Sequence, residues 1–165
     1  EEPPVTAPRP MRPETFPDYL EAAIAGYAQD NVSAGRWPEV GALERSREDF
    51  QSLLPAGLDT PDNFLFEILE ERAGLLVGFV WYTIERNHGS CIAYIYDLEL
   101  KAEHRRKGHA LRALQALESL AAADGATSIG LNVFANNLAA QQLYRRLGYE
   151  PTNFNMRKSL HKAVA

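Results

Sequence analysis

Hydrophobic and polar positions alternate along this chain with two different periods, and the changes between them predict its helices and strands. Apolar residues three or four positions apart predict amphipathic helices, and alternation every second residue predicts strands. The predicted helices are Asp18–Ala34, Glu39–Leu53, Leu111–Ala123 and Ala140–Leu147. The predicted strands are Phe64–Glu70, Leu75–Ile84, Cys91–Leu100, Ile129–Val133 and Phe154–Leu160.

The segments between these elements indicate how the elements are joined. Glu71–Gly74 and Asn87–Gly89 are typical of hairpin turns. Residues 1–17 carry six prolines and predict an extended N-terminal arm. Within that arm Val5–Met11 could pair as an edge strand, although its prolines lack the donors that a central strand needs. The order β-(α-α)-β-β-β-α-β-α-β predicts an α/β fold with one mixed sheet, and the length fits a single domain over residues 1–165.

Composition narrows the class of protein. The chain is 45% hydrophobic and 24% charged with a net charge of −5, so it is typical of globular proteins and is not expected to bind nucleic acid. No apolar run is long enough to cross a membrane and no signal peptide is evident, so we expect a cytoplasmic protein with no membrane partner. A single cysteine, Cys91, excludes an internal disulfide.

A basic turn stands out against this acidic background. Arg105-Arg106-Lys107-Gly108-His109-Ala110 follows a predicted strand and opens a predicted helix. Free N–H groups at a helix N-terminus, nearby cations and a glycine that permits close approach suit a phosphate or pyrophosphate. The alternative is a solvated basic turn before an amphipathic helix. No P-loop or dinucleotide fingerprint is present.

Two motifs carry a resemblance to a known family. Arg105-x-x-Gly108-x-Ala110 and the block Val133–Tyr149 together resemble the signatures of the GNAT superfamily of acetyl-CoA-dependent N-acetyltransferases. The resemblance covers roughly Val77–Leu160 and implies a mixed, mostly antiparallel central sheet flanked by helices. Three further segments are similar to the YycN-like branch of bacterial GNAT proteins: Gly35–Trp37, Leu53–Pro61 and Ile95–Asp97.

The resemblance implies a site for acetyl-CoA as acetyl donor. The turn that begins at Arg105 would hold the pyrophosphate through backbone groups of Arg106, Lys107, Gly108, His109 and Ala110. The main chain of Leu98, Glu99 and Leu100 would pair with the pantetheine arm, which requires that Cys91–Leu100 and Ser128–Phe134 splay apart. Asn137 would contact the pantetheine, and from its position it could also cap the fourth helix through the N–H of Ala139 or Ala140.

Three side chains are candidates for proton transfer. By resemblance Tyr144 would protonate the leaving thiolate, although the apolar spacing around it would look the same for a core tyrosine. Asp97 and Glu99 lie two apart on one strand, so they share a face and either could deprotonate an amine. Asp97 is the better candidate for this catalytic role. The same carboxylates could instead bind a cationic acceptor, or Glu99 could be solvated.

The remaining candidates are weaker. Trp37, Trp81 and Tyr82 could wall an acceptor pocket or belong to the core. His, Cys and acidic residues lack ligand spacing, so no metal is expected. The sequence therefore predicts transfer of an acetyl group from acetyl-CoA to a primary amine without a covalent enzyme intermediate. The alternative is a catalytically silent GNAT-like module that senses acetyl-CoA or holds a protein partner, and a homodimer remains open.

Overall fold

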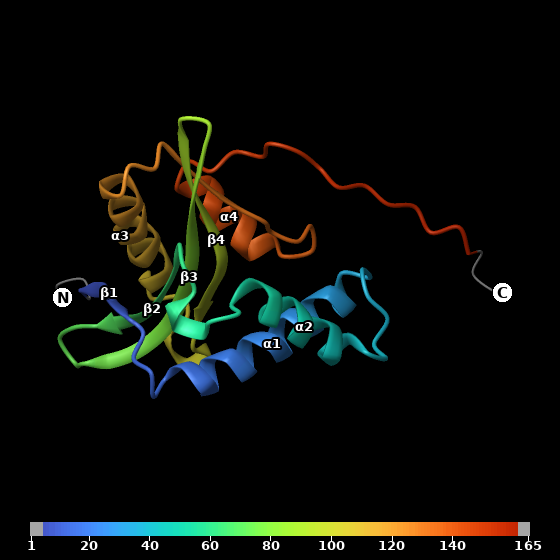
Figure 1. Ribbon diagram of the computed structural model, residues 1–165, viewed down its shortest axis with the longest axis horizontal. Helices are drawn as coiled ribbons and strands as arrows, with labels where there is room; N and C mark the ends of the chain where they lie inside the picture. The colour runs from blue at the N-terminus through green and yellow to red at the C-terminus, as the bar shows by residue number, and fades with distance from the viewer. Residues whose placement is uncertain (1–4, 162–165) are drawn as a thin grey trace.

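The computed structural model describes residues 5–161 as a mixed sheet covered by helices on both faces (Figure 1). The strands are β1 Thr6–Pro10, β2 Asn63–Glu70, β3 Leu75–Asn87, β4 Ser90–Leu100 and β5 Ser128–Leu131. The helices are α1 Phe16–Ser33, α2 Ala42–Leu53, α3 His109–Ala123 and α4 Leu138–Arg146. Short 3₁₀ turns occupy Gly57–Asp59 and Ala102–His104.

The five strands lie in the order in which they occur along the chain. Neighbouring strands from β1 to β4 are antiparallel, whereas β5 runs parallel to β4 after the α3 crossover. The hairpins at Gly74 and Gly89 have positive φ values of 64° and 82°, which glycine adopts without a steric penalty. The predicted mixed and mostly antiparallel sheet is therefore confirmed.

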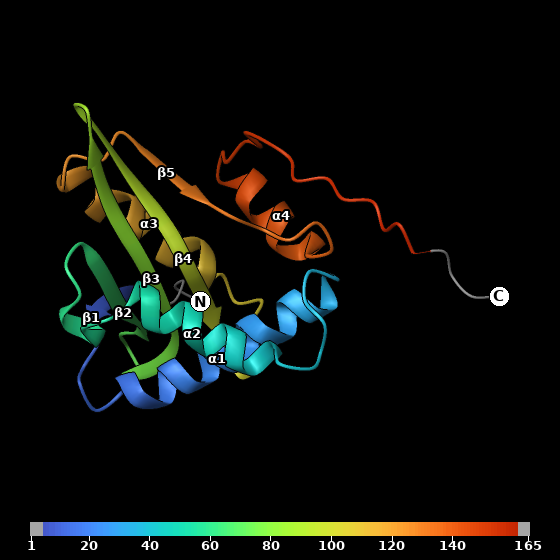
Figure 2. The ribbon, with the colours of Figure 1, turned by 45° about the vertical axis from the view of Figure 1, so that its right-hand side comes forward.

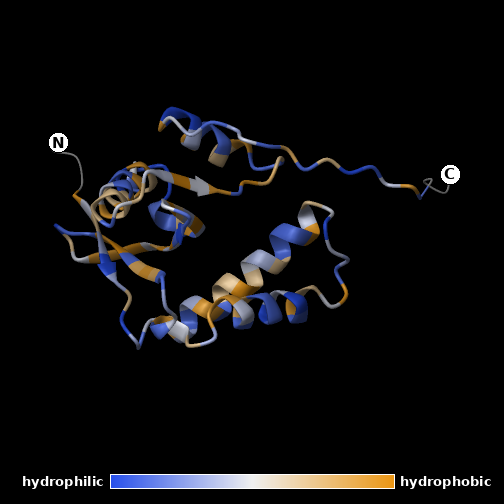
Figure 3. Cartoon of the chain, turned by 45° about the horizontal axis from the view of Figure 1, so that its top comes forward, coloured by the Kyte–Doolittle hydropathy of each residue, from blue (hydrophilic) through white to orange (hydrophobic). Residues whose placement is uncertain are grey.

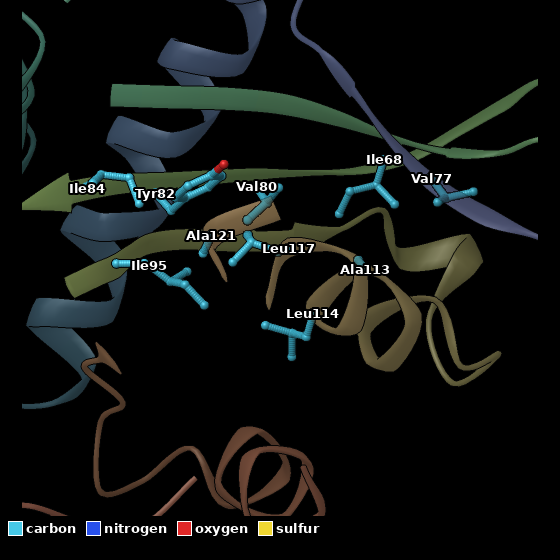
Figure 4. Close-up of a cluster of buried hydrophobic side chains, with 11 residues drawn as sticks. Ile68, Val77, Val80, Tyr82, Ile84, Ile95, Ala113, Leu114, Leu117 and Ala121 are labelled. Carbon is cyan, nitrogen blue, oxygen red and sulfur yellow. The ribbon is translucent and has the colours of Figure 1, made fainter. Parts of the chain in front are cut away.

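Side chains that alternate along β3 divide the core between two layers. Val80, Tyr82 and Ile84 point to the face that α3 covers, and Figure 4 shows them against Leu114 and Leu117. Trp81 points the other way, into a cluster with Tyr19 and Phe50 from α1 and α2. Both layers bury apolar surface on the same central strands, so the sheet rigidly connects the two helical layers.

A buried carboxylate fixes where α1 begins. Glu67 on β2 has no exposed surface and accepts hydrogen bonds from Arg9, Arg12 and Thr15 at 2.7–3.3 Å. Burial alone would raise the pKa of Glu67, but these donors and cations hold it below its usual value. The arm is thereby tied to β2, with β1 as a proline-containing edge strand, as the sequence indicated.

An extra residue in β4 changes which side chains share a face. Tyr82 pairs with Ile95 and Trp81 pairs with Asp97, so Tyr96 has no opposite residue of its own on β3. Such a bulge bends the strand and shifts its alternation by one residue. Tyr94 and Asp97 consequently lie on the same face as Trp81, although three positions separate them.

The predicted strand Phe154–Leu160 is wrong for the described structure. Every residue from Glu150 to His161 is exposed, and the chain runs away from the body without a neighbouring strand (Figures 1 and 2). A strand needs a partner for its backbone groups, and none lies beside this segment. In this segment Phe154 and Met156 alternate with polar neighbours, and Lys158 breaks the alternation before Leu160. Figure 3 shows the mixed hydropathy of the segment.

Candidate acetyl-donor and proton-transfer site

The basic turn adopts a conformation that directs backbone N–H groups outward at the start of α3. Arg106 and Gly108 have positive φ values of 61° and 82°, and Gly108 is the N-cap of α3 without any side-chain cap. Arg112 donates the first helical N–H bond to the carbonyl of Gly108, which leaves the N–H groups of the preceding turn without helical acceptors. Turns that contain residues in the left-handed backbone conformation can direct successive N–H groups toward one point and so form a concavity that binds an anion.

Cationic side chains reinforce this turn. Arg105 Nε donates to the Leu100 carbonyl at 3.1 Å, and Arg112 Nη1 donates to the Lys107 carbonyl at 3.1 Å. The sequence analysis missed Arg112; its spacing of four residues from Gly108 was the available signal. The turn therefore combines free N–H groups with a cluster of positive charge, which fits a pyrophosphate.

The His109 side chain points away from this concavity. It is 3% exposed, and its Nδ1 lies 2.9 Å from the Thr6 hydroxyl of β1. Burial, followed by the nearby cations Arg112 and His104, lowers the pKa of His109. Only the backbone of His109 is available to a bound phosphate, as the resemblance implied.

The predicted splay of β4 from β5 is present. The parallel pairing ends at Ile95 and Leu131, so among residues 5–161 no strand pairs with the rest of β4 on that side. Lys101 N–H donates to the Val77 carbonyl of β3. Because successive residues of a strand direct their backbone groups to opposite sides, Leu98 and Leu100 direct theirs away from β3, toward the open side. The backbone of Glu99 faces β3, where a side chain on Gly78 would collide with the Glu99 carbonyl. Of the three predicted main-chain positions, two thus lie on the open edge.

Asp97 forms a short hydrogen bond with a tyrosine from the other end of the sequence. Tyr19 on α1 donates its hydroxyl to Asp97 Oδ2 at 2.7 Å, and the Tyr19 side chain is itself buried. Burial raises the pKa of Asp97 to about 7, aided by the charges of Glu99 and Asp30 and opposed by the Tyr19 hydrogen bond. A carboxyl group that titrates near neutral pH is suited to general-base catalysis.

Glu99 shares the face of Asp97 but has a more solvated position. Its side chain is exposed, and partial desolvation raises its pKa, while Arg105 opposes that shift and Asp30 adds to it. The predicted common face of the two carboxylates is therefore present, and Asp97 is the more strongly perturbed of the two.

Helix α4 presents Tyr144 to the same region. Asn137 caps this helix by accepting the Ala140 N–H at 3.2 Å, which confirms the predicted cap. Tyr144 packs beside Leu143 and Leu147 against the α3-side core. Burial and then the charge of Asp97 raise the pKa of Tyr144, so its hydroxyl stays protonated at neutral pH and lies within electrostatic reach of Asp97.

Of the three aromatic candidates, the structure places Trp81 and Tyr82 in the core and leaves Trp37 partly buried. Trp81 and Tyr82 are each 1% exposed, and Trp81 donates its indole N–H to Asn63, so both are core residues. Tyr96, which the sequence analysis did not single out, stacks on Trp81 with ring centroids 4.7 Å apart and stays 40% exposed. Trp37 contacts Tyr27 edge-on.

Two kinds of feature, a metal-binding cluster and a membrane-spanning helix, are absent from residues 5–161. No group of three or more His, Cys, Asp or Glu residues in this part of the chain is placed to hold a metal ion. None of the helices described there is long and apolar enough to cross a membrane.

The chain belongs to the acetyltransferase (GNAT) family, whose model matches residues 19–149. It is similar to the uncharacterized N-acetyltransferase YycN of Bacillus subtilis (strain 168), with 38% identity over 152 residues that cover 92% of this chain and 96% of YycN. The uncharacterized N-acetyltransferase YdgE of the same organism is 33% identical over 150 residues, 91% of this chain and 95% of YdgE. The crystal structure of YycN superposes with a TM-score of 0.90 at 35% identity over 96% of this chain and 100% of that chain.

Proposed function

We propose that this protein transfers the acetyl group of acetyl-CoA directly to a primary amine. The observation that carries the proposal is the open edge of β4, which ends at the basic N-terminus of α3 and has Asp97 on the same strand. Membership of an acetyltransferase family supports the donor. The carboxylates Asp97 and Glu99 support an acceptor that arrives as a cation.

The donor would bind along the chain's own backbone. The N–H groups of residues 106–110 and the cations Arg105, Lys107 and Arg112 would hold the pyrophosphate by charge-assisted hydrogen bonds. Leu98 and Leu100 would pair with the amide groups of the pantetheine arm as a neighbouring strand does. This arrangement would direct the thioester toward the side chains around Asp97.

Asp97 would act as the general base. An alkylammonium with a pKa of about 10.4 is not nucleophilic, so a proton must leave before attack. With a pKa near 7, Asp97 is about half ionised at neutral pH and accepts that proton directly or through water. Tyr19 would act as a positioning residue, because its hydrogen bond holds one carboxylate oxygen in place.

Tyr144 would complete the reaction as general acid. The amine nitrogen attacks the acetyl carbonyl carbon and a C–N bond forms. The nitrogen then loses its second proton to water, and the C–S bond breaks to give the coenzyme A thiolate. Tyr144 donates its phenolic proton to that sulfur and regains a proton from water, while Asp97 releases its proton to solvent. The raised pKa of Tyr144 keeps the proton on the hydroxyl until the thiolate develops.

A panel of amines in a thiol-release assay tests this function. We expect free coenzyme A to appear only when a suitable amine is present. Asp97→Asn should lower that rate at a retained affinity for acetyl-CoA. Tight binding of acetyl-CoA without thiol release on any amine would contradict the proposal and favour the silent binding module.

A further inference from the structure

The side of α1 that carries Tyr19 also carries a further acidic residue, Asp30. The two residues are separated by three helical turns plus about 20°, so their side chains leave α1 on nearly the same side. Tyr19 donates its hydroxyl to Asp97, so this side of α1 faces β4. The charge of Asp30 contributes to raising the pKa of both Asp97 and Glu99, which places its carboxylate within electrostatic reach of theirs. Carboxylates from α1 and β4 therefore act on one region.

Asp30 differs from the other two carboxylates because nothing neutralises its charge. In the described part of the chain it takes part in none of the ion pairs, and partial desolvation raises its pKa without a cation that opposes the shift. Asp97 accepts the Tyr19 hydrogen bond, and Arg105 lowers the pKa of Glu99. A partly desolvated carboxylate that is repelled by two others is stabilised when a cation binds.

Aromatic rings lie beside these carboxylates on both elements. Tyr27 precedes Asp30 by three positions, so the two side chains are neighbours on α1. On β4, Tyr94 lies within electrostatic reach of Tyr27 and contacts Tyr96 edge-on, with ring centroids 5.0 Å apart. Tyr96 keeps 40% of its surface exposed. Ring faces attract ammonium groups and pack against methylene groups, so this surface suits an alkyl chain that carries positive charge.

We propose that Asp30 determines acceptor specificity by binding a second cationic group of the acceptor, which is therefore an aliphatic diamine or polyamine rather than a monoamine. This inference rests on the proposed function, since it names the substrate class of the same site. One ammonium group loses its proton to Asp97 and is acetylated, while the other keeps its charge beside Asp30. An amino acid is disfavoured, because the three carboxylates repel its carboxylate group.

Thiol release with two matched acceptors tests the role of Asp30. Butylamine and the diamine with the same four-carbon chain differ only in the second cationic group. For the wild type we expect kcat/KM to be at least about tenfold higher with the diamine. Asp30→Asn should remove this preference by raising the KM for the diamine, with the kinetics of butylamine unchanged, and Asp30→Glu should retain most of it.

Asp18→Asn is the matched control. It makes the same chemical change on α1, but Asp18 lies about 100° around the helix from Tyr19, away from the side that carries Asp30. We expect this variant to keep the wild-type preference for the diamine. Because Asp18 and Asp30 are both exposed, circular dichroism should show the wild-type fold for all three variants.

Calorimetric titration of the diamine measures binding without turnover and so separates this inference from the acetyl-transfer proposal. Diamine binding that Asp30→Asn weakens, without thiol release on any amine, would contradict acetyl transfer and support the second-cation site. Equal kcat/KM for the two acceptors, or an equal loss for both in Asp30→Asn, would overturn the role of Asp30. A diamine that neither binds nor reacts would overturn it as well.

Discussion

Asp97→Asn is expected to remove a pH-dependent loss of stability that the wild type shows between about pH 4 and pH 7. The pKa of Asp97 rises from 3.8 to about 7 on folding, chiefly through burial. In that interval the folded protein holds the proton more tightly than the unfolded chain, so the free energy of unfolding falls as the pH rises. The substituted asparagine carries no charge and can still accept the Tyr19 hydrogen bond.

The size of the effect follows from the pKa. A shift of about three units corresponds to a loss of at most about 4 kcal/mol, which is complete above pH 7 and absent below pH 4. Urea denaturation of both proteins at steps from pH 4 to pH 8.5 gives the two curves. Their difference isolates Asp97, because all other titrating groups are shared.

Glu99→Gln serves as the control for this series. This substitution removes a charge from the same face of the sheet. The Glu99 side chain is exposed, and its pKa is raised less than the pKa of Asp97. We expect the free energy of unfolding of Glu99→Gln to follow the wild-type curve against pH closely. The pH at the midpoint of the loss should be slightly lower, because Glu99 helps to raise the pKa of Asp97. Parallel curves for the wild type and Asp97→Asn would refute the assignment of a raised pKa to Asp97.

Three further predictions concern the proposed reaction. Tyr144→Phe should lower kcat about 100-fold, with an unchanged KM for acetyl-CoA and a similar Tm; a wild-type kcat would return Tyr144 to a packing role. Tyr19→Phe removes a hydrogen bond that lowers the pKa of Asp97, so the midpoint of kcat/KM against pH should move above 7, and an unmoved midpoint would contradict the pairing. Gly108→Glu should abolish acetyl-CoA binding in calorimetry. Gly108→Ala has the backbone strain of a side chain at φ 82° but adds no charge, so it should weaken binding less. Equal affinity of Gly108→Glu and the wild type for acetyl-CoA would contradict the proposed phosphate site.

Local patterns in the sequence were sufficient for most of the fold. The hairpins, the cap at Asn137 and the start of α3 near Gly108 depend on neighbours within a few residues, and each was predicted. The strand expected at Phe154–Leu160 failed because pairing depends on a partner strand that local alternation cannot reveal. The same alternation occurs whether or not a partner lies beside the segment.

The candidate site required contacts that no local pattern encodes. Asp97 could be selected from its place on a strand, but its partner Tyr19 lies 78 positions away and is brought to it by the packing of α1 on the sheet. The bulge at Tyr96 likewise depends on the register of β3 against β4. Arg112 differs from these two, because its spacing from Gly108 was a local signal, and only its contact with the Lys107 carbonyl depends on the path of the side chain.

The most direct test of the central claim follows the acetyl group itself. Acetyl-CoA with an isotopically labelled acetyl group is incubated with the protein and the amine panel, and mass spectrometry measures the labelled amide and the free thiol. The account predicts labelled acetyl on the amine nitrogen in an amount equal to the coenzyme A released, and no label retained on the protein. Label that appears only as acetate, or on the protein itself, would contradict direct transfer to an amine.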